Sequence, residues 1–162
     1  MAEELKLPTN GTKADIYEAI LPQISALTLF ETNRTASLAN VVAVLREAFG
    51  FFWVGFYLVG DDNQLVLNVF QGSVACSRIG FGRGVCGTAA KKAKSIVVDD
   101  VSKFEGHIAC SSASKSEIVV PIIKDGKVIG VLDVDSDSIA DFDTTDMNYL
   151  EALCQTVAYN CF

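Results

Sequence analysis

Residues 117 to 135 read EIVVPIIKDGKVIGVLDVD, and this stretch decides the fold. Two runs rich in β-branched residues, 117–124 and 127–135, lie on either side of Asp125-Gly126. Asp-Gly between two apolar runs is among the strongest short signals for a two-residue hairpin turn. The sequence therefore predicts a pair of antiparallel strands near the end of the chain.

A second hairpin is predicted upstream, from residues 51–59 and 65–70 around the turn-forming residues 60–63. A glycine-rich passage, residues 80–84, then leads into a short helix at about 85–93 and a strand at 95–98. Residues 99–116 form a long polar connection. Connections of that length inside a compact domain tend to be functional.

Helices are predicted at both ends of the chain. Apolar residues at helical spacing indicate a helix over about 12–30 with a break at Pro22, and a second helix from a Thr35 cap to Gly50. Asp143 is the predicted N-cap of a C-terminal helix. The pattern predicts an α+β fold in which helices pack against a central antiparallel sheet.

One domain is expected over residues 1–162, because no repeat, linker or charge run divides the chain. Its predicted parts are N-terminal helices at about 12–49, a sheet with functional loops at about 51–136, and a C-terminal helix at about 143–160. The longest uncharged apolar stretch has 13 residues, 48–60, which is too short to cross a bilayer.

The charge balance argues against nucleic-acid and membrane partners, because the net charge is −7 and the pI is near 4.6. The first residues lack the basic and apolar regions of a secretory signal. A cytoplasmic location is therefore expected. In that reducing compartment, five cysteines indicate catalytic, metal-binding or buried thiols, not permanent disulfides.

The cysteines divide into two groups. Cys154 and Cys161 follow the apolar period of the C-terminal helix and are predicted to lie in the core. Cys76, Cys86 and Cys110 lie in segments rich in glycine, serine or alanine, which is typical of reactive groups. The sequence predicts thiol redox chemistry for these three.

Two features of the sequence are expected to activate these thiols. Cys86 stands at the start of a predicted helix, where the helix dipole would lower the thiol pKa. His107, the only histidine, precedes Cys110 by three residues. Zinc held by the three thiols and His107 is a minor alternative, because the spacing contains no pair of cysteines separated by two to four residues. No metal is expected.

Acidic residues interrupt the last hairpin. Asp133 and Asp135 share one face of a strand that is otherwise apolar, and Glu117 on the partner strand would complete an acidic pocket for an ammonium group or for proton donation. In a regular two-residue hairpin, however, Glu117 pairs with Val134 and points to the other face. A shared pocket therefore requires a β-bulge, with Gly130 as the candidate position.

Four segments together resemble the free methionine-(R)-sulfoxide reductases, which are GAF-domain enzymes: GRGVCG at 82–87, GHIAC at 106–110, SEIV at 116–119 and VLDVDS at 131–136. The resemblance runs from about Phe51 to the C-terminal helix and includes Cys76, Cys86 and Cys110 in order. Cys154 and Cys161 are outside the family pattern.

The resemblance implies reduction of free L-methionine-(R)-S-oxide without a bound cofactor. Cys110 would attack the sulfoxide sulfur, and the resulting sulfenic acid would form a disulfide with Cys76, the preferred resolving thiol. Cys86 would act as a relay or as an alternative partner. Thioredoxin would supply the electrons. The resemblance also implies a homodimer.

The resemblance also implies substrate contacts. Glu117, Asp133 and Asp135 would hold the ammonium group and protonate the sulfoxide oxygen, while Trp53 and Tyr57 would contact the methyl end. From the residues alone, ordinary core packing explains Trp53 and Tyr57 equally well. The main alternative is a GAF-type sensory module that binds a small ligand without chemistry, for which three loop thiols would have no use.

Overall fold

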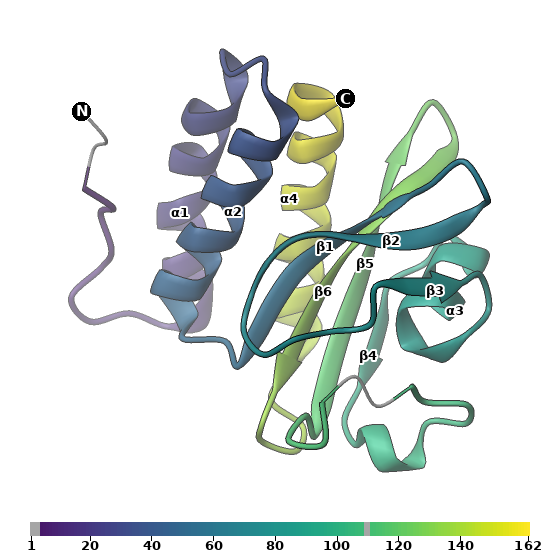
Figure 1. The fold of residues 1–162 in the computed structure, drawn as a ribbon. Coiled ribbons are helices and arrows are strands. Elements are labelled where there is room, and N and C mark those ends of the chain that lie inside the picture. Colours follow the sequence, from purple (N-terminus) through teal and green to yellow (C-terminus); the bar gives the residue numbers. More distant parts are fainter. Residues whose placement is uncertain (1–3, 109–110) are drawn as a thin grey trace.

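The structure, a computed structural model, describes residues 4–108 and 111–162. These residues form a six-stranded antiparallel sheet in the order β3-β2-β1-β6-β5-β4, with helices packed against it, so the predicted α+β class is confirmed (Figure 1). The strands are β1 Trp53–Val59, β2 Gln64–Gln71, β3 Arg78–Gly80, β4 Ile96–Val98, β5 Ser116–Lys124 and β6 Lys127–Ser136. The helices are α1 Lys13–Leu29, α2 Arg34–Phe49, α3 Gly84–Lys92 and α4 Thr144–Cys161, with a 3₁₀ turn at Val101–Lys103.

The sheet is covered on both faces. Helices α1, α2 and α4 lie together on one side, and α3 with the long loops lies on the other (Figure 1). Strand β1 shows the alternation: Val54 and Phe56 belong to the core under the three helices, whereas Trp53 and Tyr57 belong to a second core beside α3. Because both faces are buried, the central strands are apolar almost throughout.

Most helix ends follow the predicted signals. Asp143 caps α4 and forms a reciprocal capping box with Asp146, and Gly50 ends α2 in the left-handed conformation. The N-cap of α2 is Asn33, not the predicted Thr35. The side chain of Asn33 accepts a hydrogen bond from the Ala36 amide at 3.1 Å, so the helix begins one residue after it.

The predicted break at Pro22 is wrong, because α1 runs through it as one helix. A proline in a helix interior costs about 3 kcal/mol. Tyr17, Ile20 and Ile24 are fully buried by the same helix, and each such burial contributes about 1.5–3 kcal/mol. Burial therefore outweighs the proline. None of the helices within 4–108 and 111–162 is long and apolar enough to cross a membrane.

The predicted hairpin of β5 and β6 is present and contains the bulge that a shared acidic pocket requires. Ile122 pairs with Gly130 but Ile123 pairs with Val128, which leaves Ile129 as the extra residue. The bulge is thus one position away from Gly130. Beyond it the register shifts by one, and Glu117 pairs with Asp135 instead of Val134.

Candidate active site

The pairing register of β1, β6 and β5 places the acidic side chains next to one another on the α3 side of the sheet. Trp53, Asp135 and Glu117 lie in one row across β1, β6 and β5, and Gly55 and Asp133 lie in the next row. Paired residues on neighbouring antiparallel strands share a face with Cβ atoms about 4.5–5.5 Å apart. All three carboxyl groups therefore project from one small area of sheet.

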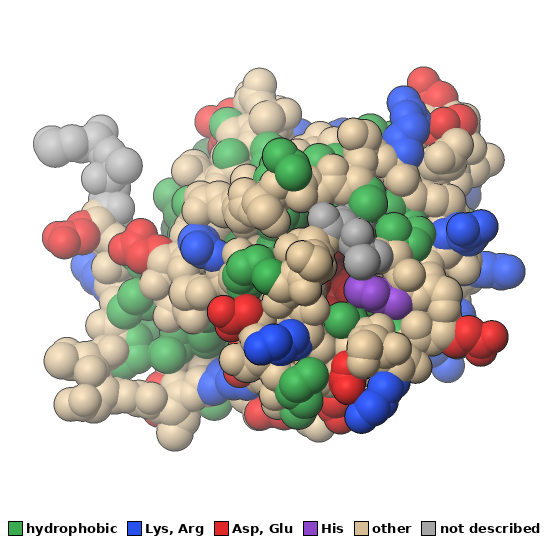
Figure 2. Space-filling model, turned by 60° about the horizontal axis from the view of Figure 1, so that its bottom comes forward, with side chains coloured by type: hydrophobic (Ala, Val, Ile, Leu, Met, Phe, Trp, Pro, Cys, Tyr) green, Lys and Arg blue, Asp and Glu red, His purple; other side chains and the backbone are tan. Residues whose placement is uncertain are grey.

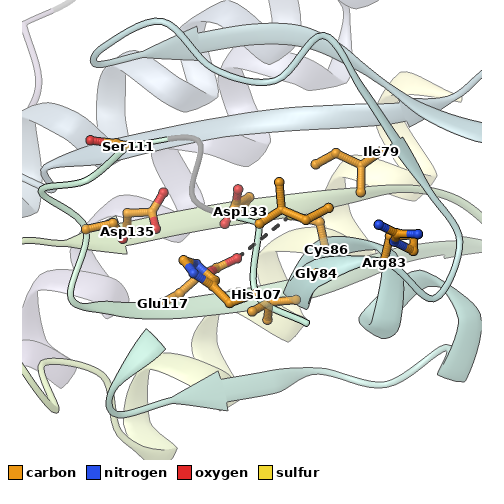
Figure 3. A pocket seen from close by; sticks show the side chains of 12 residues that line it. Ile79, Arg83, Gly84, Cys86, His107, Ser111, Glu117, Asp133 and Asp135 are labelled. Atoms are coloured by element: carbon orange, nitrogen blue, oxygen red, sulfur yellow. Dashed lines mark hydrogen bonds and ion pairs between the residues drawn. The ribbon is translucent and has the colours of Figure 1, made fainter. Parts of the chain in front are cut away.

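These carboxyl groups line one pocket (Figure 3). The remaining walls come from the β3–α3 segment and from the connection before β5: Ile79, Arg83, Gly84, Val85, Cys86, His107, Ile108, Ser111 and Ser114. An adjoining hollow includes Trp53 and Tyr57 and shares Ser111, Asp133 and Asp135 with the first. In the space-filling view, the single histidine lies beside a recess in which acidic side chains are visible (Figure 2).

Polar contacts with Ser114 and His107, which lie outside the cluster, hold two of the three carboxyl groups. The Ser114 hydroxyl donates a short hydrogen bond to Asp135 Oδ1, and His107 Nε2 lies 3.7 Å from Glu117 Oε2. Asp133 differs, because its buried Oδ1 atom has no hydrogen-bond partner among the described residues. An unsatisfied buried acceptor is costly and commonly marks a place where a ligand, ion or water binds.

The electrostatics of the cluster favour protonated carboxyl groups. Burial, together with the negative charge of Asp135, raises the pKa of Glu117 well above its ordinary value. Burial and the charges of Glu117 and Asp135 do the same to the pKa of Asp133. Burial raises the pKa of Asp135 to about 6, against the lowering effects of Ser114 and His107. Near neutral pH the cluster therefore combines retained protons with negative charge.

We expect Asp135→Asn to stabilise the protein at pH 7.5. Between about pH 4 and 6 the folded state holds a proton on Asp135 that the unfolded state has released, so wild-type stability falls as pH rises through this window. The asparagine cannot titrate, so the variant avoids this loss of unfolding free energy, which amounts to about 1–3 kcal/mol. For a chain of this size each kcal/mol raises Tm by about 2–4 °C. Scanning calorimetry under reducing conditions measures the gain.

The same experiment at pH 4 supplies the internal control, because the gain should disappear where the wild-type carboxyl is protonated in both states. Asp137→Asn is the matched variant, since Asp137 lies just beyond β6 and is exposed. It should leave Tm unchanged at both pH values. An equal Tm for Asp135→Asn and wild type at pH 7.5 would show that ionisation of Asp135 does not destabilise the folded protein.

Cys86 corrects one prediction from the sequence. It lies near the start of α3, as expected, but its side chain is buried and donates a hydrogen bond to Glu117 Oε1 at 4.0 Å. Burial and the charges of Asp133 and Glu117 raise its pKa well above the ordinary thiol value. A helix terminus contributes only about 0.3–1 kcal/mol, which is too little to offset that environment. The predicted lowering of the Cys86 pKa is wrong.

The aromatic pair on β1 holds the loop that carries Cys76. Trp53 Nε1 donates to the Ser73 carbonyl at 3.0 Å, and the Tyr57 hydroxyl donates to the Cys76 carbonyl at 3.0 Å. Trp53 also stacks between Tyr57 and Phe70, with ring centroids 6.2 and 5.4 Å away. Both rings thus line the hollow and are packed in the second core, so the two readings of this pair are compatible.

The other cysteines are placed as follows. Cys76 is partly buried against the second core, and Cys110 lies outside the described residues. Cys154 is fully inside the first core, as predicted, whereas Cys161 is half-buried at its edge. The described part of the structure therefore brings Cys86 to the acidic cluster and Cys76 to the aromatic side of the site.

Comparisons with known proteins identify the family of this chain. The GAF domain family model matches residues 31–159. The chain belongs to the GAF-domain family that includes the free methionine-R-sulfoxide reductases.

Individual relatives in this GAF-domain family match over nearly their full length. GAF domain-containing protein A of Dictyostelium discoideum is 59% identical over 150 residues, which are 93% of this chain and 94% of that protein. The free methionine-R-sulfoxide reductase of Saccharomyces cerevisiae is 39% identical over 168 residues, covering 99% and 93%. The crystal structure of the Neisseria meningitidis free methionine-R-sulfoxide reductase in complex with its substrate is 51% identical, with a TM-score of 0.93 and coverage of 98% and 96%.

Several residues of this GAF-domain site were not predicted from the sequence. Ser114 contacts Asp135, and Ser111 lines both hollows; the serine-rich run at 111–114 within the polar connection was their only signal. The expected action of His107 on Cys110 involves a residue outside the described ones, and the contact of His107 with Glu117 was not predicted. Nothing in a single sequence pairs residues 107 and 117, because the connection between them has no regular period.

Glycine is required beneath the indole ring of this GAF domain, and Gly72→Ala should displace Trp53. A Cβ atom at Gly72 would lie 2.3 Å from Trp53 Cδ1, at a backbone φ of +141°. We expect a stability loss of about 1–3 kcal/mol and a changed environment of the indole. Trp53 is the only tryptophan in the chain, so its emission spectrum reports this change directly.

Gly126→Ala is the matched control for Gly72→Ala. Gly126 also has a positive φ, +75°, but nothing lies within 4 Å of an added Cβ atom. It should cost stability through backbone strain alone and leave the Trp53 emission unchanged. Identical spectra for Gly72→Ala and wild type would contradict the proposed role of Gly72.

A metal ion could be held by a different donor set from the one considered in the sequence. Cys86 Sγ and one carboxylate oxygen each from Glu117 and Asp133 lie within 4.8 Å of one another, and all three residues are buried. Thiolate and carboxylate ligands are chemically suited to zinc. The set of three loop thiols with His107 includes Cys110 and so extends beyond the described residues.

Proposed function

We propose that this chain reduces free L-methionine-(R)-S-oxide to methionine. The observation that carries the proposal is the gathering of Glu117, Asp133 and Asp135, with raised pKa values, in one pocket bordered by Cys86 and by the loop of Cys76. The names of the yeast and Neisseria relatives support the same activity. A cluster that both holds protons and attracts a cation suits a substrate with an ammonium group and a sulfoxide.

Binding uses the two parts of the site differently. The ionised part of the acidic cluster holds the substrate ammonium, while the stacked rings of Trp53 and Tyr57 contact the methyl group. A methionine sulfoxide residue within a protein has its nitrogen in a peptide bond and carries no such charge. The pocket therefore selects the free amino acid.

The chemistry begins with attack by the Cys110 thiolate on the sulfoxide sulfur. A carboxyl group of the cluster protonates the oxygen, and the sulfur–oxygen bond breaks as the hydroxyl passes to the Cys110 sulfur. The transient bond between the two sulfurs breaks at the same time, so methionine leaves with its electron pair and Cys110 becomes a sulfenic acid. The Cys76 thiol then attacks that sulfenic sulfur, giving a disulfide and one molecule of water. Cys86 serves as a relay or an alternative resolving thiol, and thioredoxin returns both thiols to the reduced state by exchange.

A turnover assay on separated diastereomers tests the proposed function. We expect thioredoxin-dependent formation of methionine from the free R sulfoxide and none from the free S sulfoxide or from an R sulfoxide within a peptide. Binding of the free R sulfoxide, seen in Trp53 fluorescence, without any turnover would favour the sensory module instead.

The disulfide is tested separately. Reduced protein is treated with excess substrate and no reductant, alkylated, digested and mapped by mass spectrometry. We expect the peptide of Cys110 joined to that of Cys76, together with one methionine released per chain. Linkage of Cys110 to Cys86 would reverse the assignment of the resolving thiol.

A further inference from the structure

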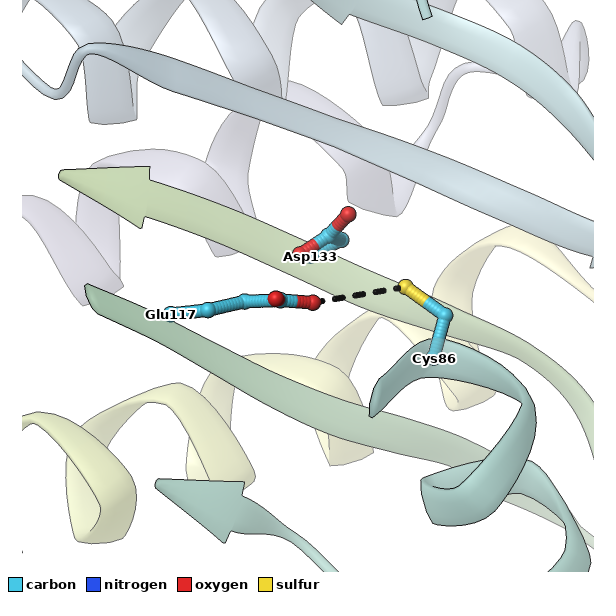
Figure 4. Close-up of side chains that lie close together, drawn as sticks. All are labelled: Cys86, Glu117 and Asp133. Carbon is cyan, nitrogen blue, oxygen red and sulfur yellow. Dashed lines mark hydrogen bonds between the residues drawn. The ribbon is translucent and has the colours of Figure 1, made fainter. Parts of the chain in front are cut away.

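The donor atoms of Cys86, Glu117 and Asp133 converge on one point from α3, β5 and β6 (Figure 4). The Cys86 sulfur lies 4.0 Å from Glu117 Oε1, and the three donor atoms lie within 4.8 Å of one another. The residues are only 3%, 6% and 7% exposed. A buried thiol and two buried carboxyl groups this close together need protons or a cation to coexist.

One oxygen of Asp133 provides a second sign of a missing ligand. Its Oδ1 atom is buried and has no hydrogen-bond partner within the part of the chain that the structure describes. Asp133 also faces Glu117 and Cys86, both of which are anions once they release their protons. A bound cation would satisfy the unpaired oxygen and remove the repulsion among the three groups.

The donor set selects the kind of cation. A thiolate excludes the hard ions Mg²⁺ and Ca²⁺, whereas one sulfur and two carboxylate oxygens suit zinc and softer divalent ions. A tetrahedral zinc ion holds its sulfur and oxygen ligands about 3.3–3.7 Å apart. The observed separations of up to 4.8 Å need small side-chain movements to reach that geometry. The arrangement is thus suited to reversible capture of an ion, with one coordination position left for water.

We propose that Cys86, Glu117 and Asp133 of the reduced protein capture a thiophilic divalent cation, with Zn²⁺ as the physiological ion. Capture of the ion is independent of the reaction. Its consequence rests on the proposed function, because Glu117 and Asp133 are there the groups that receive the substrate. An ion held between them excludes the sulfoxide, so zinc acts as a competitive inhibitor.

Cobalt absorption tests the site without using activity. Co²⁺ added to protein reduced with a phosphine should produce a thiolate-to-metal charge-transfer band and tetrahedral d–d bands. Cys86→Ser should abolish the charge-transfer band, whereas Cys110→Ser and the control Cys161→Ser should retain it. Loss of the band in Cys110→Ser, or its survival in Cys86→Ser, would overturn the assignment.

Asp133→Asn gives a second measure that does not depend on the folding of Cys86→Ser. It keeps all five thiols and should weaken Co²⁺ binding at least about tenfold, since a charged ligand is replaced by a neutral one. Asp137→Asn, which changes an exposed aspartate, is its control and should bind Co²⁺ as wild type does. Equal affinity for Asp133→Asn and wild type would remove Asp133 from the site.

Inhibition is measured in single turnovers of pre-reduced protein, so that thioredoxin thiols cannot bind the zinc. At a free Zn²⁺ concentration ten times its dissociation constant, the substrate concentration for half-maximal rate should rise about elevenfold, and a chelator should restore it. If the Co²⁺ band forms but Zn²⁺ leaves the substrate concentration for half-maximal rate unchanged, the proposed competition between zinc and the sulfoxide would be wrong. Absence of turnover without zinc would contradict the proposed function and leave the cobalt result standing.

Discussion

Cys110→Ser should lower the turnover of free methionine-R-sulfoxide by at least about a thousandfold, as expected for the loss of a nucleophile. A serine hydroxyl is a much weaker nucleophile than a thiolate and cannot form a sulfenic acid. The measurement is methionine formation from the R sulfoxide with thioredoxin as reductant. Binding should persist, since the acidic cluster and Trp53 are unchanged, and titration of Trp53 fluorescence will show it.

Cys161→Ser is the matched control for this experiment. Cys161 is a half-buried free thiol at the end of α4, on the opposite side of the sheet from the pocket. Its replacement should leave turnover within about twofold of wild type, as is usual for residues away from special features. Substantial activity in Cys110→Ser would assign the attack on sulfur to another thiol, with Cys86 as the next candidate.

Glu117→Gln should lower kcat/KM by about 10²–10⁴-fold, the usual contribution of a proton-transfer group. The glutamine keeps the shape of the side chain but removes both its ionisable proton and its charge for the ammonium group. Because burial raises the pKa of Glu117, the wild-type carboxyl keeps its proton to a higher pH than an ordinary glutamate. The wild-type rate should therefore decline as pH rises through that pKa, and the variant should lose this decline.

Glu47→Gln, an exposed position on α2, is the control and should match wild type across the pH range. Full activity of Glu117→Gln at neutral pH would exclude this carboxyl as proton donor and leave Asp133 and Asp135. A lower kcat/KM with an unchanged pH profile would assign Glu117 to binding of the ammonium group alone.

Much of the fold was predictable because its signals are local. The Asp125-Gly126 turn, the cap at Asp143 and the stop at Gly50 each act within a few residues, and the structure contains all three. Pro22 was misjudged because the burial that outweighs it involves other elements of the fold. The three-residue strand Arg78–Gly80 was missed, since it exists only through pairing with β2.

The sequence was sufficient to predict which acidic residues form the site, but not their burial or its effect on the pKa of Cys86. Asp133 and Asp135 were notable because carboxyl groups interrupt an apolar strand, and a shared face with Glu117 required a bulge that the structure contains. The pKa of Cys86 was predicted to be lowered, but it is raised. Its position at the start of α3 can be predicted from neighbouring residues, whereas its burial against Glu117, which is distant in the sequence, cannot.

The extra residue Ile129 divides the last hairpin into two parts with different tolerance of change. On the turn side, between residues 123 and 128, the chain can gain or lose length, because only the turn has to adjust. On the other side, deletion of a single residue would rotate Glu117 or the two aspartates into the apolar layer beneath the helices. Length variation among proteins with this site should therefore be confined to the tip of the hairpin.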